Sequence, residues 1–305
     1  MDWAAPDAPA AGGAPSTRRE RWVGPTDPVL LASGFPRLAP MTASDILDGG
    51  FAILKRAPAT VIGLTAAFVV PVQALGAWFN RGTSGLDLGA AFAQSDTSFQ
   101  IDTSVASGSA TLVLQIGPMI ALVFVAAGLA KLVSAWHVGH DLTLRQLLRG
   151  SVTSAGPLLV AWLFVHLLEL GSVIGFGILP LAVMTWFLVT APVIGAERLG
   201  PIQAMRRSAR LVHRRFWMVL GVALLSGLVE WLFETAIGLL PSLLSLLLGT
   251  DGIAWVLPAA VGILTQLITT PVVAGITVLI YLDLRVRTEA LDLELEAIEA
   301  FPAAA

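Results

Sequence analysis

The chain has 305 residues, of which 56% are hydrophobic and only 13% are charged, with a mean hydropathy of +0.81. This composition excludes an ordinary soluble domain and indicates an integral membrane protein. The absence of cysteine excludes disulfides, thiolate metal sites and a cysteine nucleophile. The formal net charge of −3 says little, because in a membrane protein the placement of Lys and Arg matters more than their sum.

Residues 1–40 are rich in Ala, Pro and Gly and carry the charged stretch Arg18, Arg19, Glu20 and Arg21. Such a segment buries too little apolar surface to offset its ordering entropy, so we predict a disordered tail. It contains no apolar run of the kind found in signal peptides, and we expect no cleavable signal.

Uncharged runs long enough to cross a hydrocarbon core of about 30 Å recur along the rest of the chain. The stretch from Gly156 to Ala196 is roughly twice the length of one span and has Gly171, Gly175 and Gly177 in its middle, which indicates a tight hairpin. A turn is expected from Pro241 to Asp251. The predicted spans are therefore Ala59–Phe79, Ala110–Trp136, two within Gly156–Ala196, Phe216–Leu240 and Gly252–Leu282.

A short amphipathic segment precedes each pair of spans, at Ile46–Arg56, Leu144–Val152 and Ile202–Arg215. Apolar residues in each recur at steps of three and four, with Lys or Arg nearby. Thr42 or Ser44 is the expected N-cap of the first. The pattern predicts three repeats with rough threefold pseudosymmetry, although any basic inner loop would look similar.

The predicted fold class is therefore an all-α membrane protein with six transmembrane helices in three hairpins, each preceded by a short amphipathic interfacial helix. The expected division is a tail at residues 1–40, a six-span membrane domain at residues 41–288 and an acidic tail at residues 289–305. With six spans, the outer loops hold one of the eighteen Lys and Arg residues, Arg81. The positive-inside rule then places both termini, and both tails, on the cytoplasmic side of the cell membrane.

The densest cationic cluster lies between Glu197 and Arg215. A helix of this kind lies along the membrane surface and directs its arginines to anionic headgroups, although the cluster could also act only in setting topology. Membrane lipids are thus the expected partners, with membrane or cytoplasmic proteins as further candidates. Nucleic acid is not expected, because the cations lie where the lipid surface must be. The candidate headgroup-binding residues are Arg206, Arg207, Arg210, Arg214 and Arg215.

Polar residues inside spans are costly and are the first suspects for function. His166 and Glu169 share a face of the third span, and Glu230 and Glu234 share a face of the fifth. Together they offer ligands for a divalent cation or a path for a proton. The alternative is that they reach the headgroup layer or bond to neighbouring helices. We predict no metal site and no cofactor.

Charges at the ends of spans favour ion pairs over chemistry. Glu197 lies beside Arg198 where the fourth span ends, and Asp283 lies near Arg285 at the end of the sixth. Each is expected to form an ion pair or to stabilise a helix terminus.

Three stretches between Met41 and Leu291 form a distinctive set: Asp45-Ile46-Leu47-Asp48 with Phe51; Glu197 with Gly200-Pro201, Ala204, Arg206-Arg207-Ser208 and Leu211; and Tyr281-Leu282-Asp283-Leu284-Arg285. Together they resemble a family of bacterial and archaeal membrane domains, one of which is the membrane domain of glycerophosphoryl diester phosphodiesterases. The resemblance implies a six-span helical domain of largely uncharacterised activity. Phosphodiester hydrolysis would need a separate soluble barrel with metal-bound side chains, and no polar stretch here is long enough to form one.

The sequence therefore predicts a protein that is not an enzyme and has no catalytic residues. The first hypothesis is a membrane scaffold or a domain that interacts with lipids or partner proteins. The alternative is a transporter of a small solute, an ion or protons that uses the polar residues of the third and fifth spans.

Overall fold

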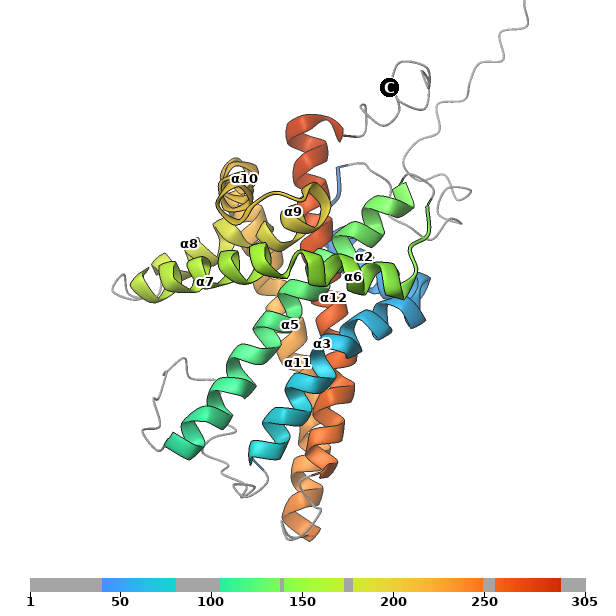
Figure 1. Cartoon of the computed structure of the whole chain (residues 1–305), viewed down its shortest axis with the longest axis vertical. Helices are drawn as coiled ribbons and strands as arrows, with labels where there is room; N and C mark the ends of the chain where they lie inside the picture. The colour runs from blue at the N-terminus through green and yellow to red at the C-terminus, as the bar shows by residue number, and fades with distance from the viewer. Residues whose placement is uncertain (1–39, 81–104, 138–139, 173–177, 249–255, 292–305) are drawn as a thin grey trace, which may run out of the picture. The chain divides into compact units, whose positions relative to one another are not determined.

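The computed structural model describes residues 40–80, 105–137, 140–172, 178–248 and 256–291 (Figure 1). The two predicted tails, apart from residues 40 and 289–291, and the loop that holds Arg81 lie outside the described residues. Within the described ranges every regular element is an α-helix. The helices are α2 (Ala43–Arg56), α3 (Pro58–Asn80), α5 (Val105–His137), α6 (Leu144–Thr153), α7 (Ala155–Ser172), α8 (Ile178–Phe187), α9 (Thr190–Glu197), α10 (Pro201–His213), α11 (Phe216–Leu248) and α12 (Val256–Glu289).

Six stretches of the described helices are long and apolar enough to cross a membrane, which confirms the predicted fold class. Each of the amphipathic helices α2, α6 and α10 precedes two of these stretches, as expected. The six stretches are Pro58–Phe79, Ile116–His137, Ala155–Ser172, Ile178–Glu197, Phe216–Leu239 and Ala259–Glu289.

The helices differ from the expected ones in three further details. The fourth span is broken between α8 and α9, because Pro192 has no N–H and its ring would clash with the carbonyl of Leu188 in a continuous helix. The turn expected from Pro241 begins later, since α11 continues to Leu248. Pro241 therefore lies within α11, and membrane helices tolerate a proline in their interior. Glu289, where the acidic tail was expected to begin, is the last residue of α12.

The three amphipathic helices share one register, counted from the residue that caps each N-terminus. Thr42 and Thr143 each form a capping box, with Asp45 and Gln146, and Gly200 precedes Pro201 at the start of α10. The fourth residue after each cap is fully buried, and the eighth is small and buried. The fourth residues are Ile46, Leu147 and Ala204, and the eighth residues are Gly50, Ser151 and Ser208.

A repeat consists of one amphipathic helix and the two spans that follow it. Each of these small residues contacts the second span of the preceding repeat, and for the first repeat this is the third. A Cβ added to Gly50 would lie 2.7 Å from Ile276 Cγ1 on α12, and one added to Gly128 on α5 would lie 3.1 Å from Ser151 Oγ. Ser208 Oγ donates a hydrogen bond of 2.8 Å to the Trp186 carbonyl on α8. The first repeat thus contacts the third, the second contacts the first, and the third contacts the second. This cyclic arrangement is what rough threefold pseudosymmetry predicts.

The second spans of the repeats are the inner ones. Between 44% and 67% of their residues are buried, against 11–28% for the first spans. Helix α5 contacts both α9 and α12, whereas α3, α7 and α11 lie toward the outside. The symmetry does not extend to tilt, because α7 runs across the direction of α11 and α12 (Figure 1).

The contact between α5 and α9 is close because one of its residues is glycine. A Cβ on Gly195 would lie 2.2 Å from the carbonyl oxygen of Ala127 and 2.8 Å from its Cα. Real side chains do not occupy such positions, so any larger residue at Gly195 must move one backbone away from the other.

Candidate functional site

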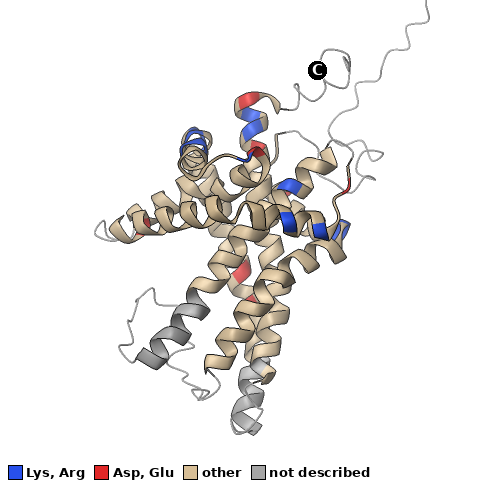
Figure 2. Cartoon of the chain, in the orientation of Figure 1, with Lys and Arg blue, Asp and Glu red and all other residues tan. Residues whose placement is uncertain are grey.

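The described Lys and Arg residues gather at one end of the described helices, which we call the basic end (Figure 2). In the ranges that the structure describes, the opposite ends of α3, α11 and α12 carry none. The residues of the basic end include Lys55, Arg56, Lys131, Arg145, Arg149, Arg198, Arg206, Arg207, Arg210, Arg214, Arg215, Arg285 and Arg287.

Helix α10 presents one apolar and one cationic face at the basic end. Its apolar face, which includes Met205 and Val212, is buried. Arg206, Arg210 and Arg214 follow one another at steps of four and are all exposed. Three of the five arginines predicted to bind headgroups therefore form a single outward row.

The other two candidate arginines have carboxylate partners within the protein. Arg207 Nε donates a hydrogen bond of 3.1 Å to Glu197 Oε2, and Arg207 Nη2 donates one of 2.7 Å to Glu289 Oε2. Hydrogen bonding to Glu289, and secondarily to Glu197, raises the pKa of the Arg207 guanidinium above its usual value. Arg215 Nη1 lies 3.9 Å from Asp283 Oδ2.

Two residues of α12 extend the ion pairs of Arg207 into a network. The Tyr281 hydroxyl donates a hydrogen bond of 2.9 Å to Glu197 Oε1. Arg285 Nε donates to Glu289 Oε2 at 3.1 Å, and Arg285 Nη1 donates to the Tyr281 hydroxyl at 3.3 Å. We call Glu197, Arg207, Tyr281, Arg285 and Glu289 the charged clasp. It joins the ends of α9 and α12 to α10 with two carboxylates matched by two guanidinium groups.

A second cluster, around Asp283, joins the start of the first repeat to the end of the third. Asp283 is fully buried, and its Oδ1 accepts hydrogen bonds of 2.8 Å from the Met41 backbone N–H and from Arg287 Nε. Arg287 Nη2 also donates to the Met41 carbonyl at 2.8 Å. The cluster therefore fixes the backbone immediately before α2.

Glu197 and Asp283 form ion pairs, as expected, but their partners are not the neighbouring cations Arg198 and Arg285. Glu197 pairs with Arg207 instead of Arg198, which is exposed and has the left-handed backbone conformation (φ 54°) that ends α9. Asp283 pairs with Arg287 instead of Arg285. Side chains four residues apart share a helix face, whereas those two apart do not.

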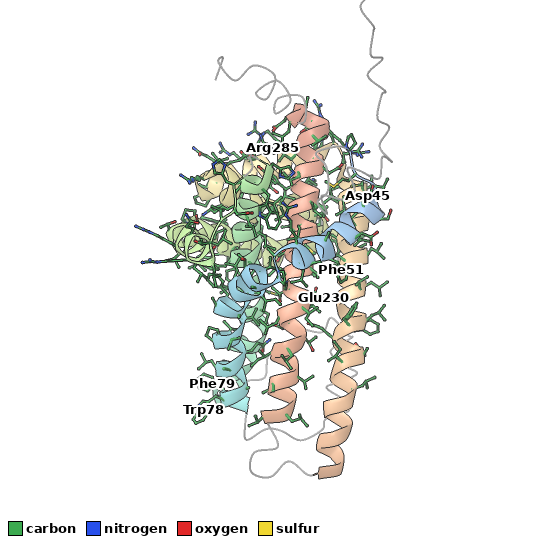
Figure 3. All side chains as sticks on the ribbon, turned by 90° about the vertical axis from the view of Figure 1, so that its right-hand side faces the viewer. Asp45, Phe51, Trp78, Phe79, Glu230 and Arg285 are labelled. Carbon is green, nitrogen blue, oxygen red and sulfur yellow. The ribbon has the colours of Figure 1, made fainter. Side chains whose placement is uncertain are left out.

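The four polar residues predicted within spans remain two separate pairs. No three or more His, Asp or Glu side chains gather at a possible metal site in the part of the chain that the structure describes. His166 Nε2 lies 3.7 Å from Glu169 Oε2, and its Nδ1 lies 2.9 Å from the Trp162 carbonyl. Glu230 lies beside α12 near Phe51 of α2 (Figure 3), while Glu234 is exposed.

Sequence reasoning missed most of the clasp as a unit. The bond from Tyr281 to Glu197 joins residues 84 positions apart, and the one from Met41 to Asp283 joins residues 242 apart, so no local pattern reveals them. The signals present in the sequence were the spacings of four between Arg285 and Glu289 and between Asp283 and Arg287.

The class of protein defined by these features is a multi-pass helical membrane protein with three helical repeats and a charged clasp at one end. No protein-family model, curated protein or solved structure matches the chain. The family resemblance noted above therefore stays a prediction. Residues from two of its three stretches meet in the clasp, namely Glu197, Arg207, Tyr281 and Arg285.

Proposed function

We propose that the chain is a non-catalytic domain of the cell membrane that binds anionic lipid headgroups through Arg206, Arg210 and Arg214. The basic end faces the cytoplasm in this proposal, as the distribution of Lys and Arg favours. The domain acts as a scaffold that presents this surface to lipids or to partner proteins.

The outward row of arginines on α10 is the observation that carries the proposal. The buried face of α10 and the clasp at Arg207 hold the helix in one orientation, so the row is positioned before any ligand arrives. Trp217 lies three residues after Arg214 and is 80% exposed, and tryptophan is enriched at membrane interfaces. Each cation near an anionic surface contributes about 1 kcal/mol, so the row supplies about 3 kcal/mol.

Transport through the polar residues of the third and fifth spans has less support. His166 and Glu169 interact with each other on α7, and Glu230 and Glu234 lie on α11 without joining them. A shared translocation site would require side chains of both pairs to converge.

Lipid selectivity in reconstituted protein tests the proposal. The full chain is placed in nanodiscs of mixed phosphatidylglycerol and phosphatidylcholine, and the enrichment of each lipid around the protein is measured by native mass spectrometry. Replacing Arg206, Arg210 and Arg214 together with Gln should reduce the preference for the anionic lipid by up to about 100-fold, the equivalent of about 3 kcal/mol. The matched control replaces the same three residues with Lys and should retain most of the preference, because headgroup attraction depends on charge. An unchanged preference in the Gln variant would refute the proposal.

The orientation has a separate test that exploits the cysteine-free sequence. Single cysteines are introduced as Gln203→Cys on α10, Ser16→Cys in the N-terminal segment and Ser84→Cys in the loop after α3. A membrane-impermeant maleimide applied to intact cells should label only Ser84→Cys. Labelling of Gln203→Cys under the same conditions would reverse the proposed orientation.

A further inference from the structure

The last turn of α12 is bonded to α10 beside the outward row of Arg206, Arg210 and Arg214, which we call the arginine row. Glu289, the last residue of α12, accepts a hydrogen bond of 2.7 Å from Arg207 Nη2. Arg207 lies three residues before Arg210 and seven before Arg214, and residues at these separations share one face of a helix. The chain therefore leaves α12 next to the arginine row.

The two residues after Glu289 fix the point from which the chain continues. Ala290 has a left-handed backbone conformation (φ 53°), which ends α12. Leu291 exposes only 8% of its surface and belongs to the hydrophobic core. The start of the next segment is thus held at the basic end, within two residues of the bond to Arg207.

Residues 292–299, which lie outside the described residues, form the acidic segment. Its sequence holds four carboxylates and no Lys or Arg. An anionic membrane surface repels carboxylates, whereas the exposed arginines of α10 attract them. The carboxylates are those of Asp292, Glu294, Glu296 and Glu299.

The acidic segment has the length and the spacing of charges that the arginine row requires. Residues four apart on an α-helix are separated by about 6 Å along its axis, so the row is about 12 Å long. Alternate residues of an extended chain are separated by about 6.8 Å, so carboxylates at positions 292, 294 and 296 match the spacing of the arginines. Eight residues reach at most about 29 Å, which covers the whole row.

We propose that the acidic segment binds the arginine row and competes there with anionic lipid headgroups. The competition rests on the headgroup binding proposed above, whereas the contact between the segment and the row does not. Attachment beside the row gives the segment a high effective concentration, so modest intrinsic affinity is enough. An anionic membrane displaces the segment, because its headgroups bind the row and repel the carboxylates.

Disulfide cross-linking tests the contact in the full chain, which has no cysteine of its own. Gln203→Cys on α10, where Gln203 is exposed, is combined with Ala297→Cys, and both changes keep every charge of the segment and the row. In nanodiscs of phosphatidylcholine that hold one chain each, mild oxidation should join the two cysteines. Replacing the three arginines of the row together with Gln should lower the yield at least fivefold. A wild-type row that gives no cross-link, or a yield unchanged by the Gln variant, would overturn the proposal.

The matched control places the second cysteine on a different amphipathic helix. Thr153→Cys on α6, where Thr153 is also exposed, replaces Gln203→Cys. Its yield with Ala297→Cys should be at least fivefold lower, because the acidic segment is anchored beside α10. Equal yields at the two positions would mean random collision and would overturn the proposal.

Lipid composition measures the competition. Adding phosphatidylglycerol to the nanodiscs should lower the cross-link yield. A segment that occupies the row about nine-tenths of the time reduces its apparent affinity for headgroups about tenfold. Replacing the four carboxylates with their amides should therefore raise the preference for phosphatidylglycerol, measured by native mass spectrometry, by about tenfold. An unchanged preference in a chain that does select phosphatidylglycerol would overturn the competition. A chain that cross-links as expected but shows no lipid preference would support the contact and refute the headgroup binding.

Discussion

Replacing Gly195 with Ala tests whether the contact between α5 and α9 is as close as the structure shows. The new Cβ would lie 2.2 Å from the Ala127 carbonyl oxygen, against a normal separation of more than 3 Å between such atoms. The obstacle is backbone, so no side-chain rotation relieves it, and the two helices must separate.

The magnitude follows from two opposing contributions. Overpacking a well-packed interior costs about 1–3 kcal/mol, and a rigid backbone contact belongs at the upper end of that range. Alanine recovers up to about 1 kcal/mol of helix propensity relative to glycine. The net expectation is a loss of about 2 kcal/mol, or roughly a 30-fold shift in the folding equilibrium. Glu197 lies two residues beyond Gly195, so the same movement should also loosen the charged clasp.

Gly221→Ala provides the matched control. It is the same substitution within a membrane-spanning helix, but no atom of the described neighbours lies within 4 Å of the added Cβ. It should be neutral or stabilise the protein by up to about 1 kcal/mol. Reversible unfolding in mixed micelles, followed by tryptophan fluorescence, measures both variants. If Gly195→Ala proves as stable as Gly221→Ala, the close contact between α5 and α9 is refuted.

Further variants test the caps and the buried charge. Arg198→Gly should raise the melting temperature by the equivalent of about 1 kcal/mol, because glycine adopts the left-handed conformation at this position without strain; a lower melting temperature would argue against that conformation. Thr42→Ala should destabilise the protein by about 1 kcal/mol at neutral pH through loss of the cap of α2. Hydrogen bonds from Thr42 lower the pKa of Asp45, so the stability they provide is present above the unfolded-state pKa and is lost as the pH falls through the lowered value. The difference between wild type and Thr42→Ala should therefore narrow in acid, and a constant difference in pH-dependent unfolding curves would contradict this. Asp283→Asn should cost about 3 kcal/mol in the same unfolding assay, because it leaves the charge of Arg287 without its buried partner; wild-type stability would show that the Asp283 cluster is not needed.

The division of the chain into helices was predictable because its signals are local. Hydropathy placed the bounds of the six spans to within seven residues, since crossing a membrane requires a minimum apolar length. The steps of three and four that mark α2, α6 and α10 are likewise properties of a single helix. Thr42 was one of two expected N-caps, and its capping box with Asp45 lies within four residues.

The partners of charged side chains were not predictable, because they depend on which helices meet. The five arginines from Arg206 to Arg215 look alike in the sequence, yet Arg207 faces Glu197 and Glu289 while Arg206 faces outward. A rotation of about 100° per residue separates these neighbours on the helix, and only the packing of α10 decides which of them turns inward.

The sequence by itself thus determined the number of membrane-spanning helices, the amphipathic helices that precede them and the end at which the cations gather. Tertiary structure alone decided the cyclic contacts of Gly50, Ser151 and Ser208, the clasp around Arg207 and the position of Glu230 beside α12. The physical reason is that burial and helix formation depend on runs of neighbouring residues, whereas ion pairs and close backbone contacts form between segments far apart in the chain.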